Sequence, residues 1–90
     1  MRRIIITTWL RHFSELTQIR TRVFVDEQQV PLADEWDGLD QTATHFLIEQ
    51  NGQAIGCARL LIDQATGAPQ FHIGRVAVLK ECRGKVLVRN

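Results

Sequence analysis

The dipeptide Asn51-Gly52 marks the centre of the predicted fold, because it separates two runs that each have the composition of a β-strand. Both residue types accept the positive φ that a type I′ turn requires, and this turn matches the twist of a two-stranded hairpin. The sequence therefore predicts a strand from Ala43 to Gln50, a tight turn, and a partner strand from Gln53 to Ile62.

The hairpin has predicted elements on both sides. A strand is predicted from Arg3 to Trp9, and a buried central strand from Gln70 to Leu79, which is rich in compact and β-branched residues. A helix is predicted from about Phe13 to Val25. Apolar residues recur in it at steps of three, three and four and form one face, made of Phe13, Leu16, Ile19 and Val23. Arg20 is predicted to lie mostly off this face.

The segment from Asp26 to Thr42 is predicted to be a long acidic loop. Pro31 excludes a helix running through it, and Gly38 indicates a turn. A loop of this length in a small domain is usually functional or disordered. Trp36, in its middle, is expected to attach it to the body of the protein.

Length and charge restrict the functional classes. The 90 residues predict one domain, 1–90, of the α+β class, with the order β-α-β-β-β, the start of a further helix, and a mostly antiparallel sheet. A formal net charge of +1 with interspersed signs indicates neither a nucleic-acid nor a membrane surface. Ile4 to Leu10 is too short for a membrane span, so a cytoplasmic protein with Cys57 and Cys82 reduced is expected.

The run from Phe71 to Asn90 combines the last predicted strand with a basic turn. Arg83-Gly84-Lys85 places two cations beside a glycine, an arrangement that suits a loop binding an anionic group through backbone N–H donors. The histidines His45 and His72 are expected to be structural. The cysteines and histidines lack the spacing of metal ligands, so no metal site is predicted.

Two groups of motifs resemble the GNAT (Gcn5-related) N-acetyltransferases. The run I-G-R-V-A-V-L-x-x-x-R-G-K, which begins at Ile73, is similar to the acetyl-CoA-binding core of that family. Upstream, one GNAT subgroup shares a series of further elements, which are Ile19-Arg20-x-x-Val23-Phe24-Val25-x-Glu27-Gln28-x-Val30-Pro31, Glu35-Trp36-Asp37-Gly38-x-Asp40, His45 and Gly56-x-Ala58-Arg59-Leu60-Leu61.

The resemblance implies the N-terminal half of a GNAT fold and acetyl transfer from acetyl-CoA to an amine, either a small molecule or an N-terminal or lysine amine. The implied cofactor-binding residues are Val76, Ala77, Val78, Arg83, Gly84 and Lys85. Glu27 and Asp37 are predicted as catalytic carboxylates, chosen from a set that also includes Glu35 and Asp40. Alternatively these acids cap turns and pair with arginines, and Arg59 and Arg75, inside strands, are predicted to pair with them.

The resemblance breaks after Lys85. The family continues with Gly-x-Gly or Gly-x-Ala and a helix, whereas this chain has Val86-Leu87-Val88 and ends two residues later. We expect a truncated domain, and one base restored before codon 86 can convert the ending into Gly-Ile-Gly-Ala-Gln. A second hypothesis is a non-catalytic half-domain that pairs with another chain, as in a homodimer through an exposed strand edge. A third is a relative of the acyl-homoserine-lactone synthases.

Overall fold

The computed structural model describes residues 1–65 and 67–83 of the chain. The predicted β-α-β-β-β order is confirmed. The elements are β1 (Arg2–Thr7), α1 (Phe13–Arg20), a π-helix (Thr21–Glu27), α2 (Leu32–Glu35), a 3₁₀ turn (Asp40–Thr42), β2 (Thr44–Gln50), β3 (Gln53–Asp63), β4 (Gln70–Val78) and a second 3₁₀ turn (Lys80–Cys82).

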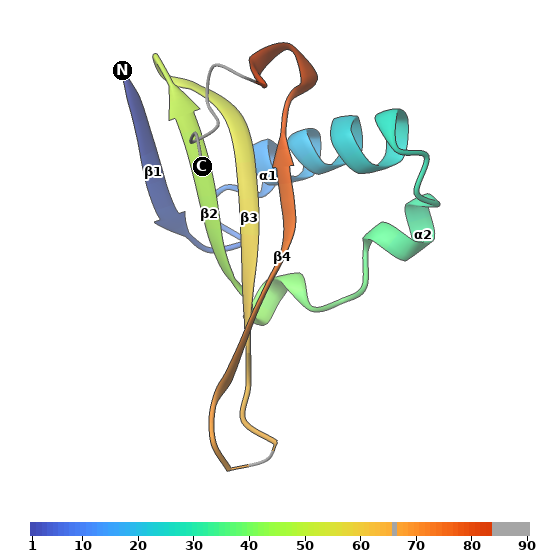
Figure 1. Ribbon diagram of the computed structural model, residues 1–90, viewed down its shortest axis with the longest axis vertical. Helices are drawn as coiled ribbons and strands as arrows, with labels where there is room; N and C mark the ends of the chain where they lie inside the picture. Colours follow the sequence, from blue (N-terminus) through green and yellow to red (C-terminus); the bar gives the residue numbers. More distant parts are fainter. Residues whose placement is uncertain (66, 84–90) are drawn as a thin grey trace.

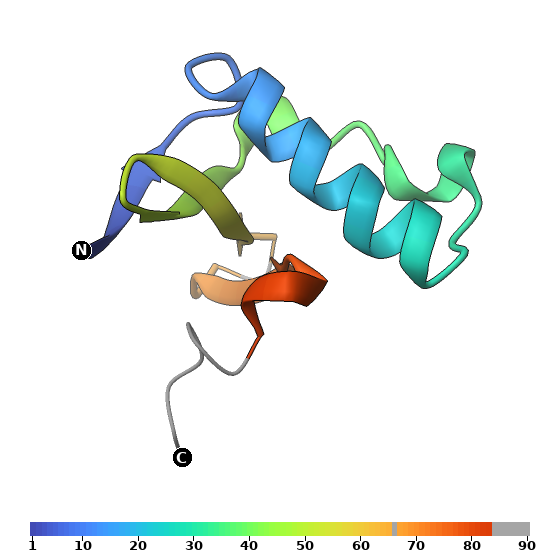
Figure 2. The ribbon, with the colours of Figure 1, turned by 90° about the horizontal axis from the view of Figure 1, so that it is seen from above.

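The four strands form one antiparallel sheet in the order β1-β2-β3-β4, so each strand pairs with the next one along the chain (Figure 1). The hairpin of β2 and β3 is confirmed. Asn51 and Gly52 have φ values of 53° and 83°, the positive values that a type I′ turn needs. Seen from above, α1 and α2 lie on the same side of this sheet (Figure 2).

The core lies between α1 and the sheet. Leu16, Ile19 and Val23 are buried, as their helical spacing predicts, and they pack in one cluster with Leu47 and Cys57 of the middle strands. Phe13 differs from the prediction, since its side chain is 52% exposed and contacts Trp9 edge to face. The helix therefore begins as expected, but its first apolar residue lies at the rim of the core.

The prediction that Arg20 lies off the buried face is wrong. Arg20 is only 1% exposed. It follows Leu16 by four residues, and side chains at that spacing share one face of a helix. After Arg20 the helix widens into π geometry, with the N–H of Gln28 bonded to the carbonyl of Val23 at 3.0 Å. Such π segments are rare and occur often at functional sites.

The segment from Asp26 to Thr42 contains more regular structure than the predicted loop. Its first two residues belong to the π-helix, and α2 begins directly after Pro31, whose φ of −56° suits a helix start. Gly38 has a φ of 80°, which agrees with the predicted turn. The pairing of its acids with arginines, described below, holds this segment against the sheet.

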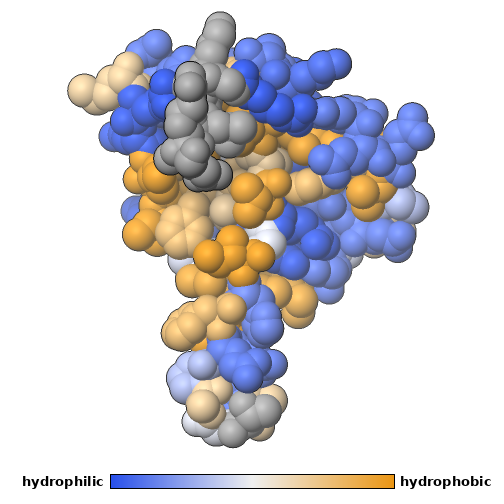
Figure 3. All heavy atoms as spheres, in the orientation of Figure 1, coloured by the Kyte–Doolittle hydropathy of each residue, from blue (hydrophilic) through white to orange (hydrophobic). Residues whose placement is uncertain are grey.

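The prediction that β4 is a buried central strand is wrong for the described residues. It is the last strand of the sheet, and Phe71, Ile73 and Val76 are 65%, 70% and 62% exposed. Ile4 and Ile6 of β1 are exposed as well. Figure 3 shows the resulting apolar area on the sheet face opposite α1. None of the helices in the described part of the chain is long and apolar enough to span a membrane.

Candidate functional site

The centre of the candidate site is a bulge in β4. Cys57 pairs with Ala77 and Arg59 pairs with Gly74, so two residues of β4, Arg75 and Val76, lie opposite the single residue between them on β3. Arg75 has a φ of 51°, a value that costs a residue with a side chain about 1–2 kcal/mol. The bulge includes Val76, the first of the predicted cofactor-binding residues, and directly precedes Ala77 and Val78.

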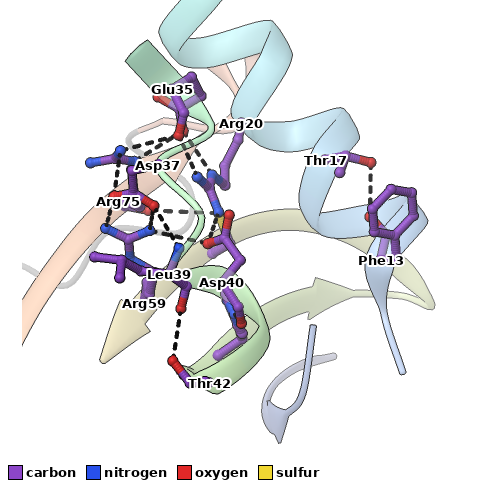
Figure 4. Close-up of polar contacts among 12 residues, drawn as sticks. Phe13, Thr17, Arg20, Glu35, Asp37, Leu39, Asp40, Thr42, Arg59 and Arg75 are labelled. Atoms are coloured by element: carbon purple, nitrogen blue, oxygen red, sulfur yellow. Dashed lines mark hydrogen bonds and ion pairs between the residues drawn. The ribbon is translucent and has the colours of Figure 1, made fainter. Parts of the chain in front are cut away.

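Arg20 is the buried anchor of the acidic segment (Figure 4). Its Nε donates to Oε2 of Glu35 at 2.7 Å, and its Nη1 donates to Oδ1 of Asp40 at 2.6 Å. The guanidinium also lies 4.7 Å from the ring centre of Trp36 and 5.4 Å from that of Trp9. Every buried charge here has an opposite partner, which is the condition for burying charge without a large loss of stability.

Arg59 and Arg75 complete a group of three arginines and three carboxylates. Arg59 binds Asp37 through two hydrogen bonds, each 2.9 Å long, and reaches Oδ1 of Asp40 at 3.1 Å. Arg75 lies 3.2 Å from both Asp37 and Glu35. The prediction that these strand arginines pair with the acidic segment is confirmed. The ion pairs also hold Arg75 in the bulge and offset the cost of its positive φ.

The two predicted catalytic carboxylates both bind arginines. Hydrogen bonds from Arg59 lower the pKa of Asp37 to about 2, and Arg75 adds to the effect. Glu27 forms a bidentate pair with Arg83 at 2.6 and 2.7 Å, which lowers its pKa as well. A carboxylate stabilised in its charged form is a weaker base. The role of either residue as a general base stays a prediction.

Asp37 gives the fold a dependence on acid pH. Its pKa of about 2 lies below its ordinary value of 3.8, so its contribution to stability is fully present above pH 3.8 and is lost as the pH falls towards 2. We expect Asp37→Asn to cost on the order of 1–2 kcal/mol near neutral pH, allowing for partial exposure, and only a small part of that at pH 2, where the folded-state carboxyl is about half protonated. Urea unfolding at several pH values measures this. A loss that is equal at all pH values would contradict the prediction, and Asp63→Asn, at an exposed carboxyl, is the matched control.

His45 and Cys57 have structural positions. His45 is 1% exposed, and its Nε2 lies 2.9 Å from the carbonyl oxygen of Asp40, which agrees with the structural role predicted for it. Burial raises the pKa of the Cys57 thiol to about 12, so the group stays protonated at neutral pH and is a poor nucleophile.

In the described part of the chain, β4 has a neighbouring strand, β3, on one side only. Its other side, which we call the open edge, carries backbone groups of the predicted cofactor-binding residues. Leu79 donates its N–H to Ile55 of β3 at 2.9 Å. Successive N–H groups of a strand point to alternate sides, so the N–H of Val78 points away from β3. The carbonyl of Val78 lies on that same side, where it accepts a hydrogen bond of 3.0 Å from Nε of Arg83. Ala77 and Val78 bury their side chains while Val76 remains exposed.

A pocket of about 450 Å³ opens beside the bulge. It joins the π-helix and the acidic segment to β4, and its lining combines apolar groups with two carboxylates and one arginine, in Phe24, Val30, Asp34, Glu35, Gly74, Arg75 and Val76. Arg83 lies in the turn that follows β4. Gly84 and Lys85, also predicted to bind the cofactor, lie outside the described residues, as do the residues of the predicted departure at 86–88.

Comparison with known proteins places this geometry in a family. The model of the acetyltransferase (GNAT) family matches residues 9–89. UPF0039 protein Rv2851c of Mycobacterium tuberculosis and UPF0039 protein Mb2876c of Mycobacterium bovis are each 37% identical over an alignment of 78 residues, which covers 83% of this chain and 49% of either relative. The chain thus spans about half the length of the curated relatives it matches.

A solved structure agrees in fold. The crystal structure of an acyl-CoA N-acyltransferase from Pseudomonas aeruginosa superposes with a TM-score of 0.80 and 32% identity, over 96% of this chain and 60% of that one. The α+β architecture with an antiparallel sheet is the one expected from the resemblance. From the match to most of its length, this chain belongs to the GNAT acetyltransferase family.

Proposed function

We propose that this chain forms the acetyl-CoA-binding part of an enzyme that transfers an acetyl group from acetyl-CoA to an amine. The observation that carries the proposal is the open edge of β4 after the bulge, where the N–H of Val78 has no partner strand among the described residues. An extended pantetheine arm resembles a peptide strand and can bind such an edge through backbone hydrogen bonds.

The proposed reaction is direct transfer. The neutral amine attacks the thioester carbonyl, a C–N bond forms, the C–S bond breaks, and the electron pair leaves with the sulfur of coenzyme A. The amine loses one proton to a base, for which Glu27 and Asp37 remain the proposed groups. An N–H near Val78 stabilises the negative charge that develops on the carbonyl oxygen. Backbone N–H groups from Arg83 onwards, with Gly84 and Lys85, bind the pyrophosphate.

The proposed acceptor is a cationic amine, either a small molecule or an N-terminal or lysine amine. The pocket beside the bulge has two carboxylates, Asp34 and Glu35, and one arginine, Arg75, in its lining. Because Glu35 is buried and paired with Arg20 and Arg75, the exposed carboxylate of Asp34 is the group proposed to attract an ammonium, and the apolar side chains of Phe24 and Val30 favour a hydrocarbon next to it. The two free cysteines suit a reducing compartment, for which we propose the cytoplasm.

The test is whether the purified chain binds acetyl-CoA. A ligand that binds only the folded state stabilises it by about 2.7 kcal/mol at 100 times its Kd, which raises the Tm of a domain of this size by roughly 10 °C or more. We expect a rise in Tm that grows with acetyl-CoA and is much smaller with ATP, which carries phosphates without the pantetheine arm. Absence of a rise, or an equal rise with ATP, would reject the proposal.

A second candidate function is pairing with another polypeptide. It is favoured by the apolar sheet face, where Ile4, Ile6, Phe71 and Ile73 are all exposed, and by the open edge of β4. A second copy of the chain is the proposed partner. Sedimentation of the purified chain distinguishes the two functions, because a half-domain that acts by pairing forms a dimer without acetyl-CoA and does not bind that ligand.

A further inference from the structure

Two ion pairs connect the π-helix to the turn that follows β4. Arg22 of the π-helix binds Glu81 of the turn at 2.8 and 3.1 Å, and Glu27 of the π-helix binds Arg83 at 2.6 and 2.7 Å. We call these four residues the clamp. Its two pairs have opposite polarity, so a displaced turn would bring like charges together.

The clamp fixes Arg83 in both position and orientation. Besides its bidentate pair with Glu27, Arg83 donates from Nε to the carbonyl of Val78 at 3.0 Å. Each of its three guanidinium nitrogens therefore has an acceptor within the protein. The guanidinium connects the open edge of β4 to the π-helix, and the chain continues directly from it into Gly84 and Lys85.

The ion pairs of the clamp are too exposed to add much to stability, which indicates that their role is to set the position of the turn. The Glu27 and Arg83 side chains are 34% and 33% exposed, and those of Glu81 and Arg22 are 55% and 46% exposed. Exposed ion pairs add little to the stability of a fold. Bidentate contacts between a guanidinium and a carboxylate nevertheless define a direction and a distance. The clamp is thus suited to placing the turn rather than to holding the domain together.

We propose that Glu27 is a positioning residue, which acts through Arg83 to hold the turn after β4 in the arrangement that receives the pyrophosphate of acetyl-CoA. This inference rests on the proposed function. This role competes with that of the general base and would leave Asp37 as the proposed base. The two roles of Glu27 predict different results when the pyrophosphate is removed from the acetyl donor.

The test compares two donors with Glu27→Gln, which keeps the size of the side chain and removes its charge. Kd is measured by nuclear magnetic resonance titration for acetyl-CoA and for S-acetylpantetheine, which has the same reactive arm without the pyrophosphate. We expect the Kd for acetyl-CoA to rise by roughly twofold to fivefold, because orientation by an exposed charge-assisted contact is lost. The Kd for S-acetylpantetheine and the Tm are expected to stay close to those of the wild type.

A control variant separates the clamp from general effects. Glu49→Gln removes the ion pair between Glu49 of β2 and Arg3 of β1, which lies away from the clamp. This variant should change neither the Kd for acetyl-CoA nor the Kd for S-acetylpantetheine.

Four outcomes would overturn the inference. Equal losses for both donors, or an unchanged Kd for acetyl-CoA in Glu27→Gln, would overturn it while leaving the proposed function standing. A slower transfer from both donors with both Kd values unchanged would instead assign Glu27 to the base. A wild-type chain that binds neither donor would reject the proposed function, and this inference with it.

Discussion

Replacing Arg20 with methionine is expected to lower the free energy of unfolding by about 3–5 kcal/mol, since it leaves the three carboxylates of this group with only two arginines, Arg59 and Arg75. Glu35 and Asp40 are 2% and 4% exposed, and Arg20 donates to both. Small domains have only about 5–15 kcal/mol of stability in total, so this change removes a large part of it. Urea unfolding followed by tryptophan fluorescence measures the loss directly, because Trp9 and Trp36 lie against the guanidinium.

Two further variants show whether burial causes the loss. Arg3→Met breaks a pair whose arginine side chain is 67% exposed, and we expect it to cost less than about 1 kcal/mol. Arg20→Lys keeps the charge but loses the planar set of donors, so an intermediate loss is expected. A stability of Arg20→Met close to that of Arg3→Met would show that the buried group is not an anchor.

Local patterns predicted most of the fold. The position of the hairpin could be predicted from Asn51-Gly52, because the type of a two-residue turn depends mainly on these two residues. The spacing of Leu16, Ile19 and Val23 defined the helix and its buried face. The short helix after Pro31 was missed, since a single turn carries too few residues for a periodic pattern to appear.

The errors concern features that depend on distant contacts. Arg20 was placed off the buried face because a charged residue is normally exposed, although its distance of four residues from Leu16 was the available signal. The burial of β4 depends on which segments lie beside and over it, and the composition of a short apolar strand does not identify them.

The candidate site was predicted in part. The pairing of Arg59 and Arg75 with the acidic segment follows from the cost of an unpaired charge inside a strand. The bulge had no signal in sequence, because Arg75 takes a φ that its residue type rarely adopts and is held there by Glu35 and Asp37. The bidentate pair of Glu27 with Arg83 joins residues far apart in the chain, which a local pattern does not detect.

If the chain carries out the proposed acetyl transfer, replacing Val78 with proline is expected to slow it by about 10²–10³-fold, the usual effect of removing one donor that stabilises a developing oxyanion. Proline lacks the N–H, and at position 78 that group points away from β3, so no hydrogen bond of the sheet is lost. The preceding residue, Ala77, is already in an extended strand, as a residue before proline prefers to be. Transfer is measured as release of the coenzyme A thiol with a primary amine as acceptor.

Val78→Ala is the matched control, because it shortens the same buried side chain and retains the N–H. Val78 is 9% exposed and belongs to a small cluster with Ile55, so both variants lose packing and both should lower the Tm. Only the proline variant should also transfer the acetyl group more slowly. If both variants lose rate equally, packing at this position explains the effect, and the oxyanion donor must be sought elsewhere. A loss confined to Val78→Pro would assign the hydrogen bond to the N–H of Val78 on the open edge of β4, the side of the strand that faces away from β3.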